Sequence, residues 1–289
     1  MLDPRYYEFE IIFLRSFFMF WPLKLSNVAL VVGINGEIGD SKPAEEVRAT
    51  LGGMEHLIPG GLNLTLLPPS TYYRKGYDRQ QLVMFWADNF TDNEYVGFID
   101  SDAAFITYVD REDLFENGKP VVNARSGLRS MRDVSTSWAA ASFEATGVLE
   151  PFKCMSYFPV IVKLSHLKEM RDHIANRYNC TFDEAFLHNI SRTAYSQFGV
   201  MCTYLYAFKR DEYTWYVHSE TPNWDGINPP PVPGQDGNIS QFTAQMMRPK
   251  PRITTHVGYR NHRHSTNIIV RNDVTFIDSF TLYFADARF

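Results

Sequence analysis

Short apolar runs of high β-propensity alternate with helix-like segments through the first hundred residues. We predict buried strands at 27–32, 62–67 and 95–99. Between the last two, residues 77–89 space their apolar side chains as one face of a helix. No internal repeat interrupts this order, so the pattern predicts an α/β fold with a mixed, mostly parallel central sheet flanked by helices.

The pattern loosens after residue 102, but it still predicts further elements within one domain spanning residues 1–289. The remaining expected strands are 10–13, 155–162 and 205–217, and the remaining expected helices are 15–25, 43–51, 135–147, 164–178 and 181–191. Residues 223–238 are rich in Pro and Gly and predict a long loop. Too little chain follows this loop to fold alone, which argues against a second domain.

Composition excludes several classes of protein. The chain is 45% hydrophobic and 21% charged, which is typical of a globular protein rather than a disordered one. Its net charge of −5 argues against general nucleic-acid binding. A late group of basic residues suits a small polyanion such as a diphosphate, or is simply a solvated face. This group comprises Arg248, Lys250, Arg252, Arg260, Arg263 and Arg271.

Other sequence signals concern the membrane and the redox compartment. The apolar segment Ile11–Trp21 contains Arg15 and is too short to span a bilayer, so we expect no membrane span. Three cysteines allow one disulfide plus a free thiol, although three buried thiols are the expectation. Five Asn-x-Ser/Thr sequons permit a secretory-pathway lumen and leave a cytoplasmic location open. They begin at Asn63, Asn89, Asn179, Asn189 and Asn238.

Two acids follow the strand predicted at 95–99, in the run Asp100-Ser101-Asp102. Residues i and i+2 of extended backbone point to the same side, so Asp100 and Asp102 can converge at the carboxyl end of the strand. Two converging carboxylates repel each other unless a cation lies between them. Hard oxygen ligands of this kind suit Mg²⁺ or Mn²⁺. The plainer alternative is a turn or a helix N-cap.

Together with four other segments, this run resembles the DxD motif of GT-A-fold glycosyltransferases, in particular a poorly characterised DxD glycosyltransferase-like family. The resemblance spans roughly residues 10–265 and implies a GT-A-like, Rossmann-like sheet. The matching segments are Asp100–Asp102, Gly76–Leu82 with its Gln-Gln-Leu run, Met155–Val160, Ser196–Phe198 and Thr255–Gly258. Gln197 stands where the family has an acid.

The resemblance implies a metal-dependent transfer of a sugar from a UDP- or GDP-sugar to a hydroxyl acceptor on a glycan or glycoconjugate. Residues 10–122 would bind the nucleotide sugar, and residues 123–289 would bind the acceptor. Asp100, Asp102 and His256 would hold Mn²⁺ or Mg²⁺, with Asp102 as a direct ligand and Asp100 near the ribose or a metal-bound water. Ser101, Arg79, Gln80, Gln81 and Arg260 would contact the donor.

Asp183 and Glu184 are the candidates for the base that deprotonates the acceptor. They lie early in a predicted helix, where acids also complement the helix dipole. A non-catalytic carbohydrate-binding protein on the same fold is the main alternative function. A phosphatase that uses D-x-D is less favoured, because Ala104 stands two residues past the second acid and the motif lies far from the start. No Gly-rich phosphate loop supports a nucleotidyltransferase.

Overall fold

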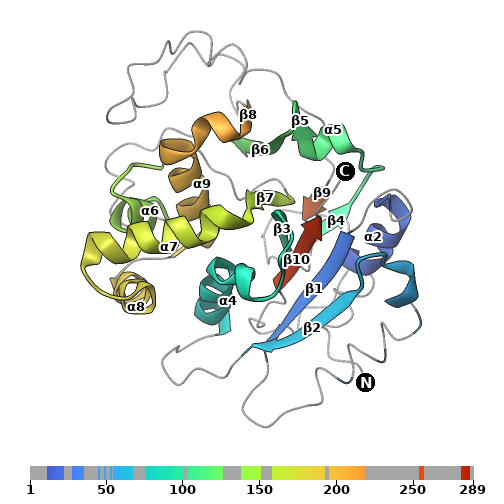
Figure 1. Ribbon diagram of the computed structural model, residues 1–289, viewed down its shortest axis with the longest axis horizontal. Coiled ribbons are helices and arrows are strands. Elements are labelled where there is room, and N and C mark those ends of the chain that lie inside the picture. The colour runs from blue at the N-terminus through green and yellow to red at the C-terminus, as the bar shows by residue number, and fades with distance from the viewer. Residues whose placement is uncertain are drawn as a thin grey trace, which may run out of the picture.

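The computed structural model describes residues 12–22, 28–35, 45, 49, 53, 55–67, 76–100, 103–125, 138–150, 158–192, 195–218, 254–256 and 281–286. It describes only the backbone of 33–35, 55, 62–67, 76–77, 125, 192, 218, 254–256 and 281–286. Within these residues the chain has mixed α/β content, as the sequence predicts. Figure 1 shows strands grouped at the centre, with α6, α7, α8 and α9 gathered on one side and α2 on the other.

The central sheet has five strands in the order β2-β1-β10-β3-β7. These strands are β1 (Val28–Asn35), β2 (Leu62–Leu67), β3 (Tyr95–Asp100), β7 (Val160–Lys163) and β10 (Thr281–Asp286). β1 and β2 pair in parallel, whereas β1–β10, β10–β3 and β3–β7 are antiparallel. One parallel pair against three antiparallel pairs makes the expectation of a mostly parallel sheet wrong.

The reason is the position of β10. Strands β1, β2 and β3 share one direction, as alternation of strands and helices predicts. However, β10 lies between β1 and β3 in the opposite direction, with Thr281 beside Asp100. No strand was expected so late in the sequence.

Two smaller sheets accompany the central one. β4 (Ala103–Phe105) pairs antiparallel with β9 (Thr254–His256). The second small sheet has the order β5-β6-β8 and lies above the central sheet in Figure 1. Its strands are β5 (Phe115–Glu116), β6 (Lys119–Arg125) and β8 (Thr214–His218).

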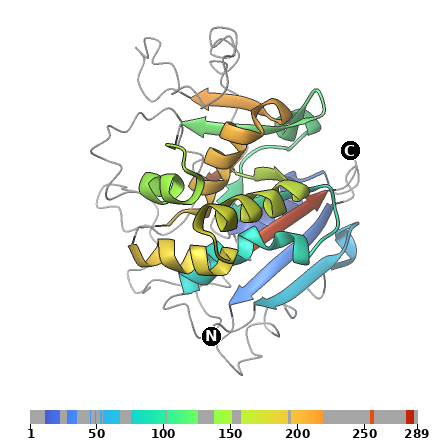
Figure 2. The same cartoon turned by 60° about the vertical axis from the view of Figure 1, so that its left-hand side comes forward.

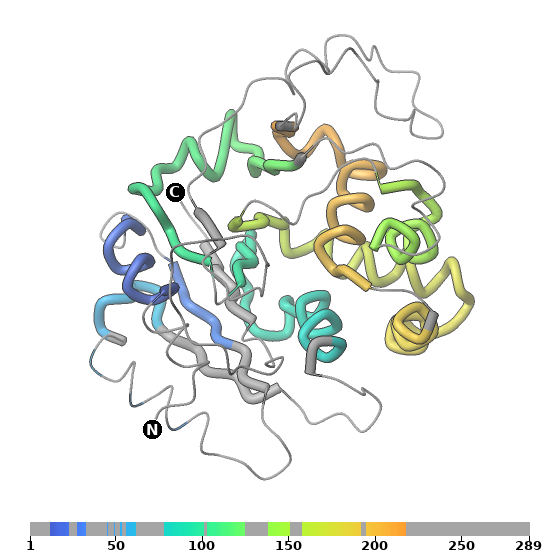
Figure 3. Tube along the Cα trace, turned by 180° about the vertical axis from the view of Figure 1, so that it is seen from behind, coloured from blue at the N-terminus to red at the C-terminus, as the bar shows by residue number. Residues whose placement is uncertain are grey.

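Figure 2 shows α7 and α4 lying across one face of the central sheet, and Figure 3 shows the sheet from behind. The longer helices are α2 (Arg15–Phe20), α4 (Gly76–Phe85), α6 (Trp138–Thr146), α7 (Leu164–Tyr178), α8 (Phe182–Arg192) and α9 (Gln197–Phe208). The short elements are η2 (Glu55–Leu57), η3 (Ala87–Asn89), α5 (Arg111–Leu114) and η4 (Arg210–Glu212).

Most of the expected elements are confirmed, and α7 has the bounds that the sequence predicts. Two expectations are wrong. Residues 12 and 13, expected in a strand, are helical, and residues 205–208 belong to α9 rather than to a strand. Residues 197–207 of α9 are buried, so packing on all sides stabilises a helix there despite its β-prone aromatic residues.

One apolar cluster forms the core and draws side chains from both halves of the chain. Phe13, Phe98, Phe186 and Phe198 are fully buried members of it. Burial of each such side chain contributes about 1.5–3 kcal/mol. The described helices contain none that is long and apolar enough to cross a membrane.

The cysteines differ from expectation. Cys202 in α9 is disulfide-bonded and Cys180 is a free thiol. The expectation of three thiols is therefore wrong, and the alternative with one disulfide holds. Cys154 lies outside the described residues.

Candidate functional site

The carboxyl end of β3 is the starting point of the candidate site. Val96, Phe98 and Ile99 are fully buried, so the strand is anchored in the core, and Asp100 at its end is half-buried. A carboxylate there lies at the edge where the buried strand reaches solvent. Ser101 and Asp102 lie outside the described residues.

The chain resumes at β4, and its ladder with β9 brings the late histidine to this place. His256 pairs with Ala103, the residue directly after Asp102. Cα atoms paired across antiparallel strands are about 4.5–5.5 Å apart. The backbones of two segments separated by about 150 residues therefore meet beside the acidic run. His256 is described by its backbone alone, and Lys250 and Arg260 lie outside the described residues.

Gln80 and Gln81 on α4 are both buried, with 3% and 2% of their surface exposed. The Oε1 atom of Gln81 accepts a hydrogen bond of 2.7 Å from the backbone N–H of Gln197. Gln197 is the first residue of α9, whose N–H has no partner inside its own helix. Gln81 thus stabilises the start of α9. The contact joins Gly76–Leu82 to Ser196–Phe198, two of the segments on which the resemblance depends.

Buried polar oxygens remain beside this contact. The Oε1 atoms of Gln80 and Gln197 have no hydrogen-bond partner in the part of the chain that the structure describes. Buried acceptors of this kind are costly unless water or a ligand satisfies them. Arg79, the neighbouring candidate, is half-buried on α4.

The amino end of α9 approaches the acidic end of β3. Ser196 caps the helix, its Oγ accepting from the N–H of Gly199 at 3.2 Å. The ring of Phe198 lies 6.5 Å from that of Phe98 and 5.2 Å from that of Phe158. Phe98 precedes Asp100 by two residues, so both belong to the same face of β3. The start of α9 therefore packs against the face of β3 on which Asp100 lies.

Sequence reasoning missed a carboxylate at this end of α9. Glu150 Oε2 accepts a hydrogen bond of 3.3 Å from Ser142 Oγ on α6. A Cβ atom added to Gly199 would lie 3.2 Å from the same Oε2 atom, which measures how closely Glu150 approaches α9. Glu150 stands in a connecting segment without a motif, so nothing in the sequence pointed to it.

Asp183 and Glu184 lie in the first turn of α8, and both side chains accept hydrogen bonds there. Glu184 Oε2 accepts from the backbone N–H and the hydroxyl of Thr181, at 2.9 and 2.7 Å. These hydrogen bonds lower the pKa of Glu184, so it is a weaker base than an ordinary glutamate. Because Thr181 Oγ1 also accepts from the N–H of Glu184, the pair forms a capping box.

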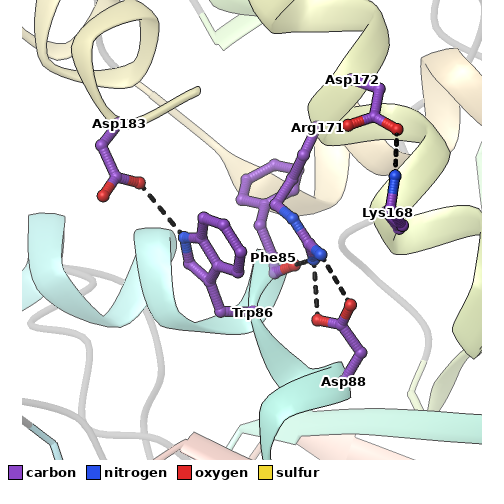
Figure 4. Close-up of polar contacts among 7 residues, drawn as sticks. All are labelled: Phe85, Trp86, Asp88, Lys168, Arg171, Asp172 and Asp183. Atoms are coloured by element: carbon purple, nitrogen blue, oxygen red, sulfur yellow. Dashed lines mark hydrogen bonds and ion pairs between the residues drawn. The ribbon is translucent and has the colours of Figure 1, made fainter. Parts of the chain in front are cut away.

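Asp183 accepts a hydrogen bond of 3.2 Å from the indole N–H of Trp86 (Figure 4). Trp86 follows α4 directly, close to the residues that lead into the beginning of β3. Asp100 lies at the other end of β3, about 17 Å along the strand from Tyr95. The structure thus places Asp183 beside the opposite end of β3 from the acidic run.

Figure 4 also shows the ion pair that fixes this region. Arg171 on α7 donates to both carboxylate oxygens of Asp88, at 2.7 and 2.6 Å, and to the carbonyl of Phe85. Its guanidinium carbon lies 4.0 Å from the centre of the Trp86 ring. These contacts join α4 to α7 and explain why Trp86 holds a fixed position for Asp183.

Among the side chains that the structure describes, no three His, Cys, Asp or Glu residues form a group able to hold a metal ion. Of the predicted set of Asp100, Asp102 and His256, only Asp100 has a described side chain. Its chemistry, carboxylate oxygens with an imidazole nitrogen, is a donor set that suits Mn²⁺.

In comparisons with known proteins, no family model, no curated protein and no solved structure matches this chain.

Proposed function

We propose that the chain is a metal-dependent glycosyltransferase that moves a sugar from a nucleoside-diphosphate sugar to a hydroxyl group of a glycan acceptor. The observation that carries the proposal is the register of β4 and β9. It sets the backbone of His256 beside Ala103, directly after the Asp100–Asp102 run. In this proposal the carboxylates of the acidic run and the imidazole of His256, which come from distant parts of the sequence, would meet at the end of a buried strand.

In this proposal the fold is GT-A-like. Three observations support it: β1, β2 and β3 share one direction, β7 lies antiparallel beside β3, and α4 connects β2 to β3. The carboxyl ends of such strands are where α/β sheets bind nucleotides. One feature is not part of a Rossmann-like sheet: β10 lies between β1 and β3 and separates these two strands.

Asp100, Asp102 and His256 would hold Mn²⁺ or Mg²⁺, and the bound cation would neutralise charge on the diphosphate leaving group. Ser101, Arg79 and Arg260 are the donor contacts in this proposal. Gln80 is assigned to the same region because its buried oxygen has no hydrogen-bond partner among the residues that the structure describes. Gln81 is assigned to positioning, since its oxygen holds the start of α9.

Asp183 and Glu184 are the candidates for the base that deprotonates the acceptor hydroxyl, yet both already make structural contacts at the start of α8. This observation favours a second candidate function, a carbohydrate-binding protein that keeps the fold without the chemistry. Transfer activity separates the two, because a binder retains glycan affinity and has no turnover.

Thermal unfolding with UDP, GDP or CMP, each with and without Mn²⁺, tests the proposal. We expect one nucleoside diphosphate to raise the Tm only when Mn²⁺ is present. Ligand at 100 times its Kd stabilises a protein by about 2.7 kcal/mol, so the shift should be several degrees. Absence of a shift with every nucleotide would count against the proposal.

Matched variants locate the effect. Asp102→Asn and Asp100→Asn should abolish the metal-dependent shift, whereas Asp183→Asn should leave it unchanged because Asp183 lies toward the other end of β3. A phosphatase would instead release phosphate from a monoester substrate. Loss of the shift in Asp183→Asn alone would relocate the site to α8.

A further inference from the structure

We propose that Asn179 and Asn89 carry N-linked glycans and that Asn189 does not, although all three begin an Asn-x-Ser/Thr sequon. The sequence cannot rank these residues, because each triplet satisfies the same rule. The structure ranks them by exposure and by the contacts of each side chain. The inference does not depend on the glycosyltransferase proposal.

Asn179 is suited to modification by its place at the end of α7. It adopts left-handed backbone geometry, with φ 53° and ψ 43°, and its backbone N–H bonds to the carbonyls of Ala175 and Asn176. Backbone atoms alone make this cap, and the residue is exposed. An Nδ2 atom there can carry a large substituent without breaking a contact that holds the fold.

Asn89 has similar surroundings. It is the last residue of η3, it is exposed, and its backbone N–H bonds to the carbonyl of Trp86 at 3.0 Å. The Thr91 of the same sequon accepts from the N–H of Asn93, as expected of a turn. Both candidate residues therefore end a helical segment and enter irregular backbone.

Asn189 lies inside α8 and is only 1% exposed. Its Oδ1 atom accepts a hydrogen bond of 2.9 Å from the hydroxyl of Tyr178. A glycan on its Nδ2 would have to displace the packing between α7 and α8. Of the other sequons, Asn63 is described by its backbone alone and Asn238 lies outside the described residues.

A second observation points to the compartment in which such glycans are attached. Cys202 is disulfide-bonded within the buried helix α9. Disulfides form and persist in oxidising compartments such as the lumen of the endoplasmic reticulum, and are rare in the cytosol. The disulfide is independent of the sequons, and it favours the same compartment in which glycans would be attached to them.

Glycans at these positions would leave the candidate site open. Asn89 precedes the beginning of β3, whereas Asp100 lies at its end. The turn between α7 and α8, which holds Asn179, lies on the opposite side of the molecule from β4 and β9 (Figure 1). Modification and the proposed activity can therefore coexist.

The modification is a group transfer from a lipid-pyrophosphate-linked oligosaccharide, performed by the compartment's oligosaccharyltransferase. The Asn Nδ2 atom attacks the anomeric carbon of the oligosaccharide. The bond from that carbon to the pyrophosphate oxygen breaks, the lipid pyrophosphate leaves, and Nδ2 loses one proton.

The test is peptide mass spectrometry on the full chain purified from the cells that make it. Release of N-glycans with PNGase F in ¹⁸O-labelled water converts each glycosylated Asn into ¹⁸O-labelled Asp, so every sequon is scored separately. We expect label at Asn179 and Asn89 and none at Asn189. Absence of label at both Asn179 and Asn89, or label at Asn189, would overturn the proposal. Label at only one of the first two would retain that site and reject the other.

Variants provide a second measurement. Asn179→Gly fits the left-handed backbone of the cap, so it should remove one glycan and its mobility shift while the protein stays folded. Asn89→Gln should remove the other. Asn189→Gln is the matched control and should leave the number of glycans unchanged. If burial prevents that control from folding, the unmodified chain still decides the question through its labelled peptides.

Discussion

At the scale of single residues, Arg171 is a buried cation whose partners are all in place. Its side chain is 7% exposed and that of Asp88 is 22% exposed. Replacing Asp88 by Ala leaves the guanidinium buried with its charge uncompensated. We expect a loss of about 3–5 kcal/mol in the free energy of unfolding, measured by urea titration.

An exposed ion pair on the same helix is the control. Lys168 and Asp172 lie 2.6 Å apart with 69% and 56% of their side chains exposed. Lys168→Ala should cost no more than about 0.5 kcal/mol. Equal losses for the two variants would contradict the importance of burial at Arg171.

His166 is a second residue whose burial has a measurable consequence. It is 2% exposed, its Nδ1 lies 2.8 Å from the hydroxyl of Tyr213, and its Nε2 lies 3.2 Å from Glu212. Burial lowers its pKa, a shift opposed by Glu212 and Glu169 and reinforced by Lys209 and Lys163. The neutral imidazole is therefore the form that the folded protein favours.

The sign of the pH dependence follows from this shift. Below the unfolded-state pKa of about 6.5, the unfolded chain binds more protons than the folded one. The stabilising contribution of His166 is thus complete above that pH and is lost as the pH falls to its folded-state pKa. We expect the urea midpoint to fall from pH 7 to pH 5 and the fall to be smaller in His166→Gln. An unchanged slope in that variant would refute the assignment.

At the scale of elements, the start of α9 depends on one buried hydrogen bond. Gln81→Leu removes the acceptor and leaves the N–H of Gln197 buried, which should cost about 1–3 kcal/mol. Gln197→Pro removes the donor at a first-turn position that tolerates proline. Ser196 before it has φ −136° and ψ 110°, which also suits the residue preceding a proline.

A double-mutant cycle in urea, with Gln197→Ala as the reference, isolates this bond. The combination of Gln81→Leu and Gln197→Pro should lose less than the sum of the single variants, since neither partner is left alone. Strict additivity would show that the contact does not position α9.

The same scale shows where sequence patterns predict elements and where they do not. Helix α7 alternates apolar and charged residues, so its spacing predicts its bounds. Helix α9 is buried along most of its length, and a continuous apolar run has no period from which to tell helix from strand. The sequence therefore predicts a strand where the last residues of this helix lie.

At the scale of the whole molecule, β10 is the strand that closes the central sheet. It pairs with β1 on one side and β3 on the other. A chain ending at residue 279 would leave two strand edges unpaired in the middle of the sheet, where they promote aggregation. We expect this chain to lose its cooperative urea transition and to aggregate. A chain ending at Asp286 is the control and should unfold as the full chain does, by circular dichroism.

The candidate site likewise has a part that local sequence predicts and a part that depends on tertiary packing. Asp100 and Asp102 could be selected from the sequence because an i, i+2 pair of acids after a buried run has a local geometric meaning. Glu150 could not be found, and the burial of Gln80 and Gln81 could not be foreseen, because both depend on packing between α4, α6 and α9. The metal set and the acceptor's base stay predictions.

The sequence by itself determined the strands β1, β2 and β3, the helices α4 and α7, and the place of the acidic run. Each of these features depends on the pattern of neighbouring residues, which the sequence contains directly. Only the tertiary structure decided that β10 enters the centre of the sheet, that His256 lies beside Ala103, and that Asp183 belongs to Trp86. These outcomes depend on which distant surfaces pack together, and no local pattern of residues carries that information.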